Sequence, residues 1–282
     1  MNVPLRLLSP AKLNLFLHVI GRRGDGYHLL QTLFQLLDHG DVLEFSATDS
    51  PDIVLRGNCG GVGVTDNLIV RAARLLQAHT GCARGAEIRL DKRLPLGGGL
   101  GGGSSNAATT LLALDHLWGL ALPRDELAAL GLRLGADVPV FVHGRSAWAE
   151  GVGEVLTPLE IPPAWYVVLT PPVAVSTAEI FSHPQLTRDT PALKIPAFPI
   201  LGAKNDCEPV ASLLYPEIRE ALAWLGRFGE ARLTGTGASV FAAFARREEA
   251  ASVYARRPGN LRGFLAKGVS LSPVHRGLEA GG

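Results

Sequence analysis

Apolar and polar side chains alternate over residues 9–20, with the period that is typical of a β-strand. One face carries only apolar side chains, those of Ala11, Leu13, Leu15, Leu17 and Val19. Lys12 and Asn14 share the opposite face, which is commonly solvated, so a lysine there needs no functional explanation by itself. A glycine-containing turn follows. Tyr27 and His28 come directly after this turn, where they either meet a ligand or pack against the protein.

Similar patterns divide the rest of the chain into helices and strands. Helical spacing of apolar positions predicts helices over residues 67–79, 104–118, 123–134, 176–181 and 247–256. Strands are predicted over residues 41–45, 53–55, 87–94, 165–170 and 263–271, and strand–turn–strand units over 146–156 and 231–244. We expect residues 41–45 and 53–55 to form a hairpin, and Thr65 or Asp66 to cap the helix that follows. This mixture of elements, without an internal repeat, is an α+β pattern.

The chain of 282 residues is long enough for one large or two ordinary domains. Its composition changes where Ile161, Pro162 and Pro163 lead into a new apolar strand. Exposed, proline-rich segments are typical of domain boundaries. We therefore expect two domains, over residues 1–160 and 161–282.

A glycine-rich stretch, which we call the glycine loop, leads directly into the predicted helix over residues 104–118. The loop consists of Pro95, Leu96, Gly97, Gly98, Gly99, Leu100, Gly101, Gly102, Gly103, Ser104 and Ser105. Glycines let the backbone approach a ligand closely, at an entropic cost to folding that some function must justify. With the helix beginning at Ser104 or Ser105, its free N–H groups and the positive end of its dipole face the loop. The stretch therefore predicts an anion site, for phosphate.

Two better-known glycine motifs do not fit the glycine loop. Gly97, Gly99 and Gly102 satisfy the spacing GxGxxG, but only a short strand ending in proline precedes them, and no acidic residue ends a second strand at the usual distance. A P-loop requires Lys and then Ser or Thr where this chain has Gly103 and Ser104. A merely flexible linker is disfavoured, because linkers are seldom so rich in glycine beside so strong a helix start.

Two charged residues outside the glycine loop are candidates for a role in phosphate chemistry. Lys92 lies in the strand before the loop, where it either reaches a phosphate as a point charge or lies on the surface. Asp137 precedes Val138 and Pro139, a sequence typical of an N-cap for a short helical turn. A capping aspartate and a catalytic one are compatible interpretations.

The composition favours a small-molecule ligand. The formal net charge is +1 and no basic run is present, so neither nucleic acid nor an acidic membrane is expected as the main partner. Cys59, Cys82 and Cys207 are odd in number and far apart, which fits neither a disulfide framework nor a zinc site. No signal-peptide pattern or membrane-spanning run is evident in the sequence. We expect a soluble, cytoplasmic protein.

Three stretches together resemble the superfamily of galactokinase, homoserine kinase, mevalonate kinase and phosphomevalonate kinase, abbreviated GHMP. These are residues 10–15 (Pro-Ala-Lys-Leu-Asn-Leu), the glycine loop, and residues 233–237 (Leu-Thr-Gly-Thr-Gly). Residues 25–28, 135–141 and 271–273 are similar to the branch of that superfamily whose substrate is a cytidine diphosphate-linked methylerythritol. The resemblance covers nearly the whole chain.

The resemblance implies two α+β domains, the first like domain 2 of ribosomal protein S5 and the second ferredoxin-like, with the active site in the cleft between them. It implies transfer of the γ-phosphoryl group of ATP, with Mg²⁺, to the 2-hydroxyl of 4-diphosphocytidyl-2-C-methylerythritol in the non-mevalonate route to isoprenoids. The products would be the 2-phosphate and ADP. A monomer or weak homodimer is expected. The alternatives are a mevalonate or homoserine kinase, or a nucleotide-binding protein without catalysis.

The resemblance also assigns roles to particular residues. Asp137 would accept the proton of the substrate hydroxyl, while Lys12 would keep it ionised and stabilise charge around the γ-phosphate. Tyr27, His28 and Phe181 match the family's cytidine pocket. Further substrate contacts are expected from Asn14, Thr177, Gly235, Thr236 and Gly237, and further ATP contacts from Lys92 and Asn67. Mg²⁺ would lie near Ser105, without a dedicated set of carboxylate ligands.

Overall fold

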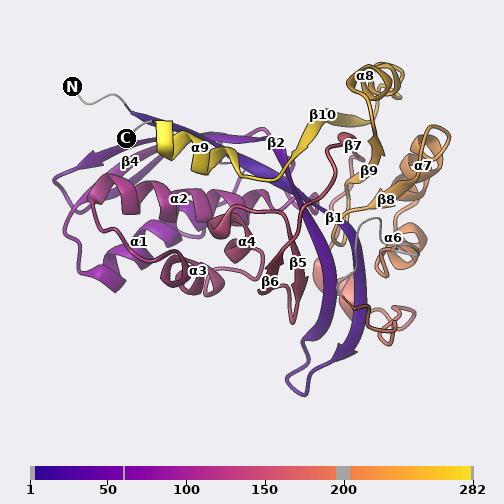
Figure 1. The fold of residues 1–282 in the computed structure, drawn as a ribbon, viewed down its shortest axis with the longest axis horizontal. Helices are drawn as coiled ribbons and strands as arrows, with labels where there is room; N and C mark the ends of the chain where they lie inside the picture. Colours follow the sequence, from indigo (N-terminus) through magenta and orange to yellow (C-terminus); the bar gives the residue numbers. More distant parts are fainter. Residues whose placement is uncertain (1–3, 60, 195–203, 281–282) are drawn as a thin grey trace.

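Two long antiparallel strands run through the middle of the molecule (Figure 1). The computed structural model describes residues 4–59, 61–194 and 204–280. The two long strands are β1 (Leu5–Arg22) and β2 (His28–Thr48), which pair along nearly their whole length with irregularities in register at three places. The polar face of β1 is not solvated: Lys12 is 4% exposed and Asn14 3%. Burying such groups is costly unless they have polar partners, so this face is a candidate site.

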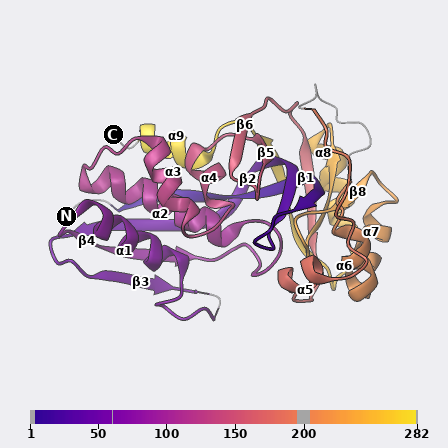
Figure 2. The same ribbon diagram turned by 90° about the horizontal axis from the view of Figure 1, so that it is seen from below.

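The first half of the chain surrounds one end of this strand pair (Figures 1 and 2). Its elements are β3 (Ile53–Gly57), α1 (Leu68–Thr80), β4 (Gly85–Asp91), α2 (Gly102–Trp118), α3 (Arg124–Leu132), α4 (Val138–His143), β5 (Ala147–Glu150) and β6 (Val155–Pro158). Apolar side chains of α1, α2, β2 and β4 form its core. β5 pairs with β2 and with β6.

One strand pairing differs from the prediction. The hairpin expected between residues 41–45 and 53–55 is wrong, because β4 pairs antiparallel with residues 42–48 of β2 and so occupies the position beside them. β3 pairs with the other edge of β4, and parallel to it. A parallel pair cannot be joined by a tight turn, and here α1 lies between the two strands in the sequence.

The second half of the chain forms its own layer of strands and helices. Its elements are β7 (Trp165–Thr170), α5 (Thr177–Ser182), α6 (Glu208–Leu214), α7 (Pro216–Leu225), β8 (Ala231–Leu233), β9 (Val240–Phe244), α8 (Arg247–Ala255), β10 (Arg262–Val269) and α9 (Pro273–Ala280). Its strands follow the order β10-β7-β9-β8. The apolar core beneath α6 and α7 also takes Leu17 and Val19 from β1.

β10 joins the two halves into one continuous sheet. Residues 262–267 pair with β7, and Gly268 and Val269 pair with β2. The chain then returns to the first half, where Val274 of α9 shares a core with Leu7 (Figure 1). The α+β class is confirmed by this arrangement, whereas the boundary at residue 160 stays a prediction. Within residues 4–59, 61–194 and 204–280, no helix combines the length and apolar character that crossing a bilayer requires.

Candidate active site

The glycine loop takes a conformation that only glycine adopts readily. Gly97, Gly99 and Gly101 have φ angles of 63°, 72° and 70°. α2 begins at Gly102, two or three residues before the predicted start at Ser104 or Ser105. A left-handed Gly101 supplies the N-cap without a side-chain hydrogen bond, which is why the serines gave a misleading start signal.

Neighbouring segments hold the loop from both sides. The backbone N–H of Lys12 donates to the carbonyl oxygen of Leu100 at 3.0 Å, and that of Ser239 donates to Gly98 at 3.2 Å. Gly99 approaches the turn after β8 so closely that a Cβ there would lie 2.2 Å from the carbonyl oxygen of Thr234. The close approach therefore requires glycine at this position.

A cavity of about 330 Å³, which we call the smaller cavity, lies along the glycine loop. All loop residues but Ser105 line it, together with Lys92 and Asn67. Asn67 is also the N-cap of α1, with its side chain accepting from the N–H of Ile69 at 3.0 Å, so the prediction of Thr65 or Asp66 as the cap was wrong. Free N–H groups at the start of α2 and the Lys92 ammonium make this cavity suited to phosphate.

Asp41 organises one wall of the smaller cavity, and sequence reasoning missed it. Its fully buried carboxylate accepts from Lys92 Nζ at 2.7 Å and from the backbone N–H groups of Arg93 and Leu94, both at 2.8 Å. Asn106 Nδ2, in the second turn of α2, donates to it at 2.9 Å. Asp41 thus fixes Lys92 and the entrance to the glycine loop. The sequence did not indicate this role, because Asp41 is a single acidic residue in a predicted strand and its partners are distant in the sequence.

A second cavity, of about 870 Å³, meets the first and is called the larger cavity here. Gly99 and Gly101 line both. Its wall includes most of the predicted catalytic and substrate-binding residues: Lys12, Asn14, Tyr27, His28, Asp137, Thr177, Phe181, Gly235 and Thr236. Gly237 is outside the two cavities, where a Cβ would meet Ile218 and Leu233 at 3.2 Å.

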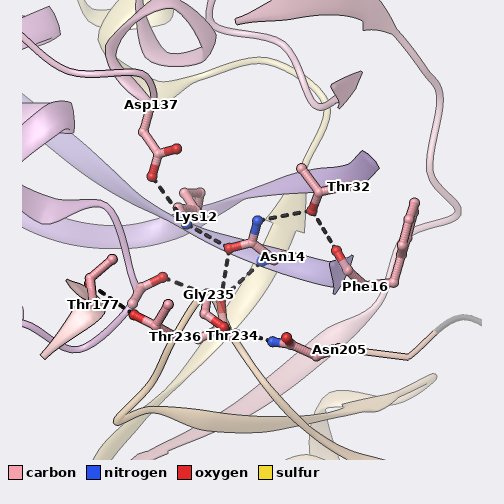
Figure 3. Close-up of polar contacts among 11 residues, drawn as sticks. Lys12, Asn14, Phe16, Thr32, Asp137, Thr177, Asn205, Thr234, Gly235 and Thr236 are labelled. Carbon is pink, nitrogen blue, oxygen red and sulfur yellow. Dashed lines mark hydrogen bonds and ion pairs between the residues drawn. The ribbon is translucent and has the colours of Figure 1, made fainter. Parts of the chain in front are cut away.

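Lys12 and Asp137 form an ion pair at the junction of the two cavities (Figure 3). Lys12 Nζ lies 3.2 Å from Asp137 Oδ2 and donates to Asn14 Oδ1 at 2.6 Å. The Lys12 side chain is 5% exposed and that of Asp137 33%. Asp137 occupies the N-cap position of α4 but makes no capping hydrogen bond through its side chain. Its carboxylate is therefore directed to Lys12 and the cavity rather than to the helix.

The turn after β8 closes the same junction (Figure 3). Thr234 Oγ1 accepts from the N–H of Asn14 at 3.0 Å and lies 3.3 Å from the carbonyl oxygen of Gly99, to which it donates. Asn205 Nδ2 donates to the carbonyl oxygen of Gly235 at 2.8 Å. Thr236 and Thr177 share a hydroxyl–hydroxyl bond of 3.0 Å. Thr234 and Asn205 were missed, although Thr234 is directly next to the predicted Gly235.

The far end of the larger cavity is aromatic. His28 stacks on Phe181, with ring centroids 5.1 Å apart and 27° between the planes, and Tyr27 is 66% exposed. Arg188 Nε donates to His28 Nε2 at 3.1 Å. Burial lowers the pKa of His28, and the charges of Arg188 and Arg22 lower it further. The imidazole is thus held neutral beside an open aromatic surface.

The oxygen groups near the start of α2 differ in their access to the cavities. Ser105 Oγ is buried and lies 2.8 Å from Ser9 Oγ, whereas Ser104 lines the smaller cavity. Among the described residues, no group of three His, Cys, Asp or Glu side chains could hold a metal ion. Hydroxyls such as that of Ser104 and the carboxylate of Asp137 are oxygen ligands that the cavities offer to a cation.

Known protein families match both halves of the chain. Residues 67–145 match the family described as GHMP kinases N terminal domain, and residues 195–261 match GHMP kinases C terminal. The chain belongs to the GHMP kinase family. As a GHMP kinase it is a phosphotransferase with ATP as donor and an alcohol as acceptor.

Similar proteins place this GHMP kinase more narrowly. Curated proteins from Pseudomonas paraeruginosa and Pseudomonas aeruginosa are 58% and 59% identical over 279 residues, covering 99% of both chains in each comparison. Both are named 4-diphosphocytidyl-2-C-methyl-D-erythritol kinase. A crystal structure of a 4-(cytidine 5'-diphospho)-2C-methyl-D-erythritol kinase superposes with a TM-score of 0.83 at 35% identity, covering 93% of this chain and 98% of the other.

More distant structures share the fold of this GHMP kinase. A mevalonate kinase from Methanococcus jannaschii superposes with a TM-score of 0.67 at 17% identity and covers 95% of this chain and 99% of its own. At such identity the likeness shows the fold alone. The two-domain GHMP fold expected from the sequence is confirmed.

Proposed function

We propose that the chain transfers the γ-phosphoryl group of ATP to the 2-hydroxyl of 4-diphosphocytidyl-2-C-methyl-D-erythritol, a step of the non-mevalonate route to isoprenoids. The names of the relatives at 58–59% identity support this substrate. The observation that carries the proposal is that the smaller and larger cavities meet at Gly99 and Gly101, with the Lys12–Asp137 pair beside this junction. Donor and acceptor would therefore meet at one place.

The glycine loop would bind the phosphates of ATP. Phosphoryl transfer asks a protein mainly to align the nucleophile and to stabilise charge on the phosphoryl oxygens. Backbone N–H groups of the loop and the start of α2 supply fixed dipoles for that charge. Lys92, held by Asp41 at 2.7 Å, adds a cation on the same side.

Asp137 would accept the proton of the attacking hydroxyl. One carboxylate oxygen lies 3.2 Å from Lys12 Nζ, and within the described residues the other has no hydrogen bond to the protein. The second oxygen is thus available to the substrate. Lys12 is fixed by Asn14 and by its own burial, so its charge would stay at the junction, next to the transferred group.

Mg²⁺ is part of the proposal as a companion of ATP. When bound, it would neutralise charge on the nucleotide phosphates. The Ser104 hydroxyl, at the start of α2 in the smaller cavity, is a protein oxygen able to approach it, and lies next to the predicted Ser105. Mg²⁺ needs only a few protein ligands, because it usually keeps several waters and also binds the phosphates of the substrate.

The aromatic end of the larger cavity would bind the cytosine ring, with the Tyr27 and Phe181 rings facing the base and His28 meeting its edge. Aromatic faces suit a planar base, and both ends of the cavity belong to one continuous space. A mevalonate or homoserine kinase is not favoured, since the structures of such kinases match this chain at only 13–17% identity. The intact Lys12–Asp137 pair argues against a protein without catalysis.

The test is ADP release by the purified chain with ATP, Mg²⁺ and 4-diphosphocytidyl-2-C-methyl-D-erythritol, beside mevalonate, homoserine and galactose. We expect turnover with the cytidine compound alone. Turnover with another alcohol would move the chain to another branch of the family, and ATP binding without turnover would support a binding protein. Sedimentation at several concentrations tests the expected monomer or weak homodimer, and subcellular fractionation the cytoplasmic location.

A further inference from the structure

Arg188 links the two stacked aromatic residues of the larger cavity, His28 and Phe181, and no motif in the sequence contains it. Besides its bond to His28 Nε2, its guanidinium donates to the carbonyl oxygens of Phe181 at 2.8 Å, His183 at 2.9 Å and Leu186 at 3.1 Å. Four hydrogen bonds hold one half-buried side chain in a single position. Arg188 thus fixes the turn after α5 and the His28 ring at once.

The bond between Arg188 and His28 determines where the imidazole proton lies. A guanidinium only donates, so His28 Nε2 must present a lone pair. A neutral imidazole that accepts at Nε2 carries its proton on Nδ1. The lowered pKa of His28 agrees with this neutral ring. His28 Nδ1 has no hydrogen-bond partner in the part of the chain that the structure describes, so its proton remains available to a ligand in the larger cavity.

We propose that Arg188 is a positioning residue that holds His28 as its Nδ1–H tautomer, so that the larger cavity selects a pyrimidine with an acceptor at ring position N3. Cytosine has a lone pair at N3, whereas uracil has an N–H there. The N–H donor on His28 forms a hydrogen bond with N3 of cytosine, but it faces another donor at N3 of uracil. This inference rests on the proposed function, because it takes the base-binding end of that site as given.

A purely structural role for Arg188 has different consequences. If the residue served only to hold Phe181 and His183 in place, its loss would weaken all ligands of the larger cavity by the same factor. Loss of tautomer control instead changes the ratio between the two bases. An imidazole free to carry its proton on either nitrogen can accept from an N–H at N3 as well as donate to a lone pair.

The experiment uses the full chain labelled with ¹⁵N in histidine. The two ring-nitrogen shifts of His28, assigned by comparison with His28→Gln, report the tautomer in the wild type, Arg188→Met and Arg188→Lys. The same samples are titrated with cytidine diphosphate and uridine diphosphate. Arg74→Met, on the exposed face of α1, is the matched control.

We expect His28 of the wild type to carry its proton on Nδ1. The Kd for cytidine diphosphate should be about tenfold or more lower than the Kd for uridine diphosphate, because two donors face each other without an acceptor in the uridine complex. Arg188→Met should shift the proton towards Nε2 and reduce this ratio several-fold. Arg188→Lys, which keeps a cationic donor, should restore most of it. Arg74→Met should match the wild type.

Two results would overturn the inference. One is an unchanged Nδ1–H tautomer in Arg188→Met, and the other is an equal loss of affinity for both nucleotides. Neither depends on turnover, so a failure of the proposed kinase activity would be recognised separately, as absent ADP release from a protein whose His28 tautomer still follows Arg188.

Discussion

The two cavities that meet at Gly99 and Gly101 are built in opposite ways. The smaller cavity is formed largely by one continuous run of backbone, the glycine loop and the start of α2. The larger cavity is lined mainly by side chains from β1, the turn before β2, β2 itself, the residue before α4, α5 and the turn after β8. The first depends on the absence of side chains, and the second on their identity.

This difference predicts how each cavity responds to mutation. A Cβ added to the glycine loop changes backbone geometry, so it should affect ATP binding and folding together. A side chain removed from the larger cavity leaves the backbone in place, so it should affect chemistry or substrate binding while the fold persists. Three experiments test this distinction.

Asp137→Asn should have the largest effect. The amide keeps the size of the side chain but cannot accept the hydroxyl proton in the same way, and general-base removal typically costs on the order of 10² to 10⁴ in rate. We expect kcat to fall by about that factor while the KM values for ATP and the alcohol change by less than about threefold. Initial rates of ADP release measure all three quantities.

The control for this variant is Asp125→Asn, which removes an exposed carboxylate on α3 that lines neither cavity. Its kcat should equal that of the wild type. If Asp137→Asn keeps more than a tenth of the wild-type kcat, Asp137 orients the hydroxyl rather than accepting its proton.

Gly99→Ala and Gly97→Ala form a matched pair within the glycine loop. Both glycines have a positive φ, so each alanine carries a similar backbone strain of about 1 kcal/mol. Only at Gly99 does the new Cβ also meet backbone, 2.2 Å from the Thr234 carbonyl oxygen, while at Gly97 nothing lies within 4 Å. We expect Gly99→Ala to raise the KM for ATP about tenfold or more and to lower the melting temperature.

Gly97→Ala should show a clearly smaller change in both measurements. Equal effects of the two alanines on ATP binding would mean that strain within the loop, rather than its contact with the turn after β8, controls the smaller cavity. Thermal unfolding and ATP titration of both variants decide between these explanations.

The sequence was informative where one segment acts alone. The glycine loop is recognisable because its unusual composition lies within eleven consecutive residues, and β1 because its alternation is local. The start of α2 was placed too late because a left-handed Gly101 caps the helix without a side chain. The hairpin was wrong because pairing with β4, from a distant part of the chain, decided where β3 lies.

Only the resemblance to a family predicted that the residues of the larger cavity form one site. Lys12 and Asp137 are 125 positions apart in the sequence, and no spacing rule joins them. Asp41 and Arg188 resembled an ordinary strand residue and an ordinary surface residue, because their roles consist of hydrogen bonds to distant segments. Such residues become visible only when the fold has brought their partners together.

Tyr27→Ala should have the smallest effect and separates the two cavities most directly. The side chain is 66% exposed and lines only the larger cavity, so its loss should leave the melting temperature and the KM for ATP unchanged. Stacking of an aromatic ring on a base contributes about 1–3 kcal/mol, so the KM for the cytidine substrate should rise about tenfold. Tyr27→Phe, which keeps the ring, should behave as the wild type. A parallel rise in the KM for ATP would show that binding in the two cavities is coupled. The two cavities would then differ in how they are built but would not act independently.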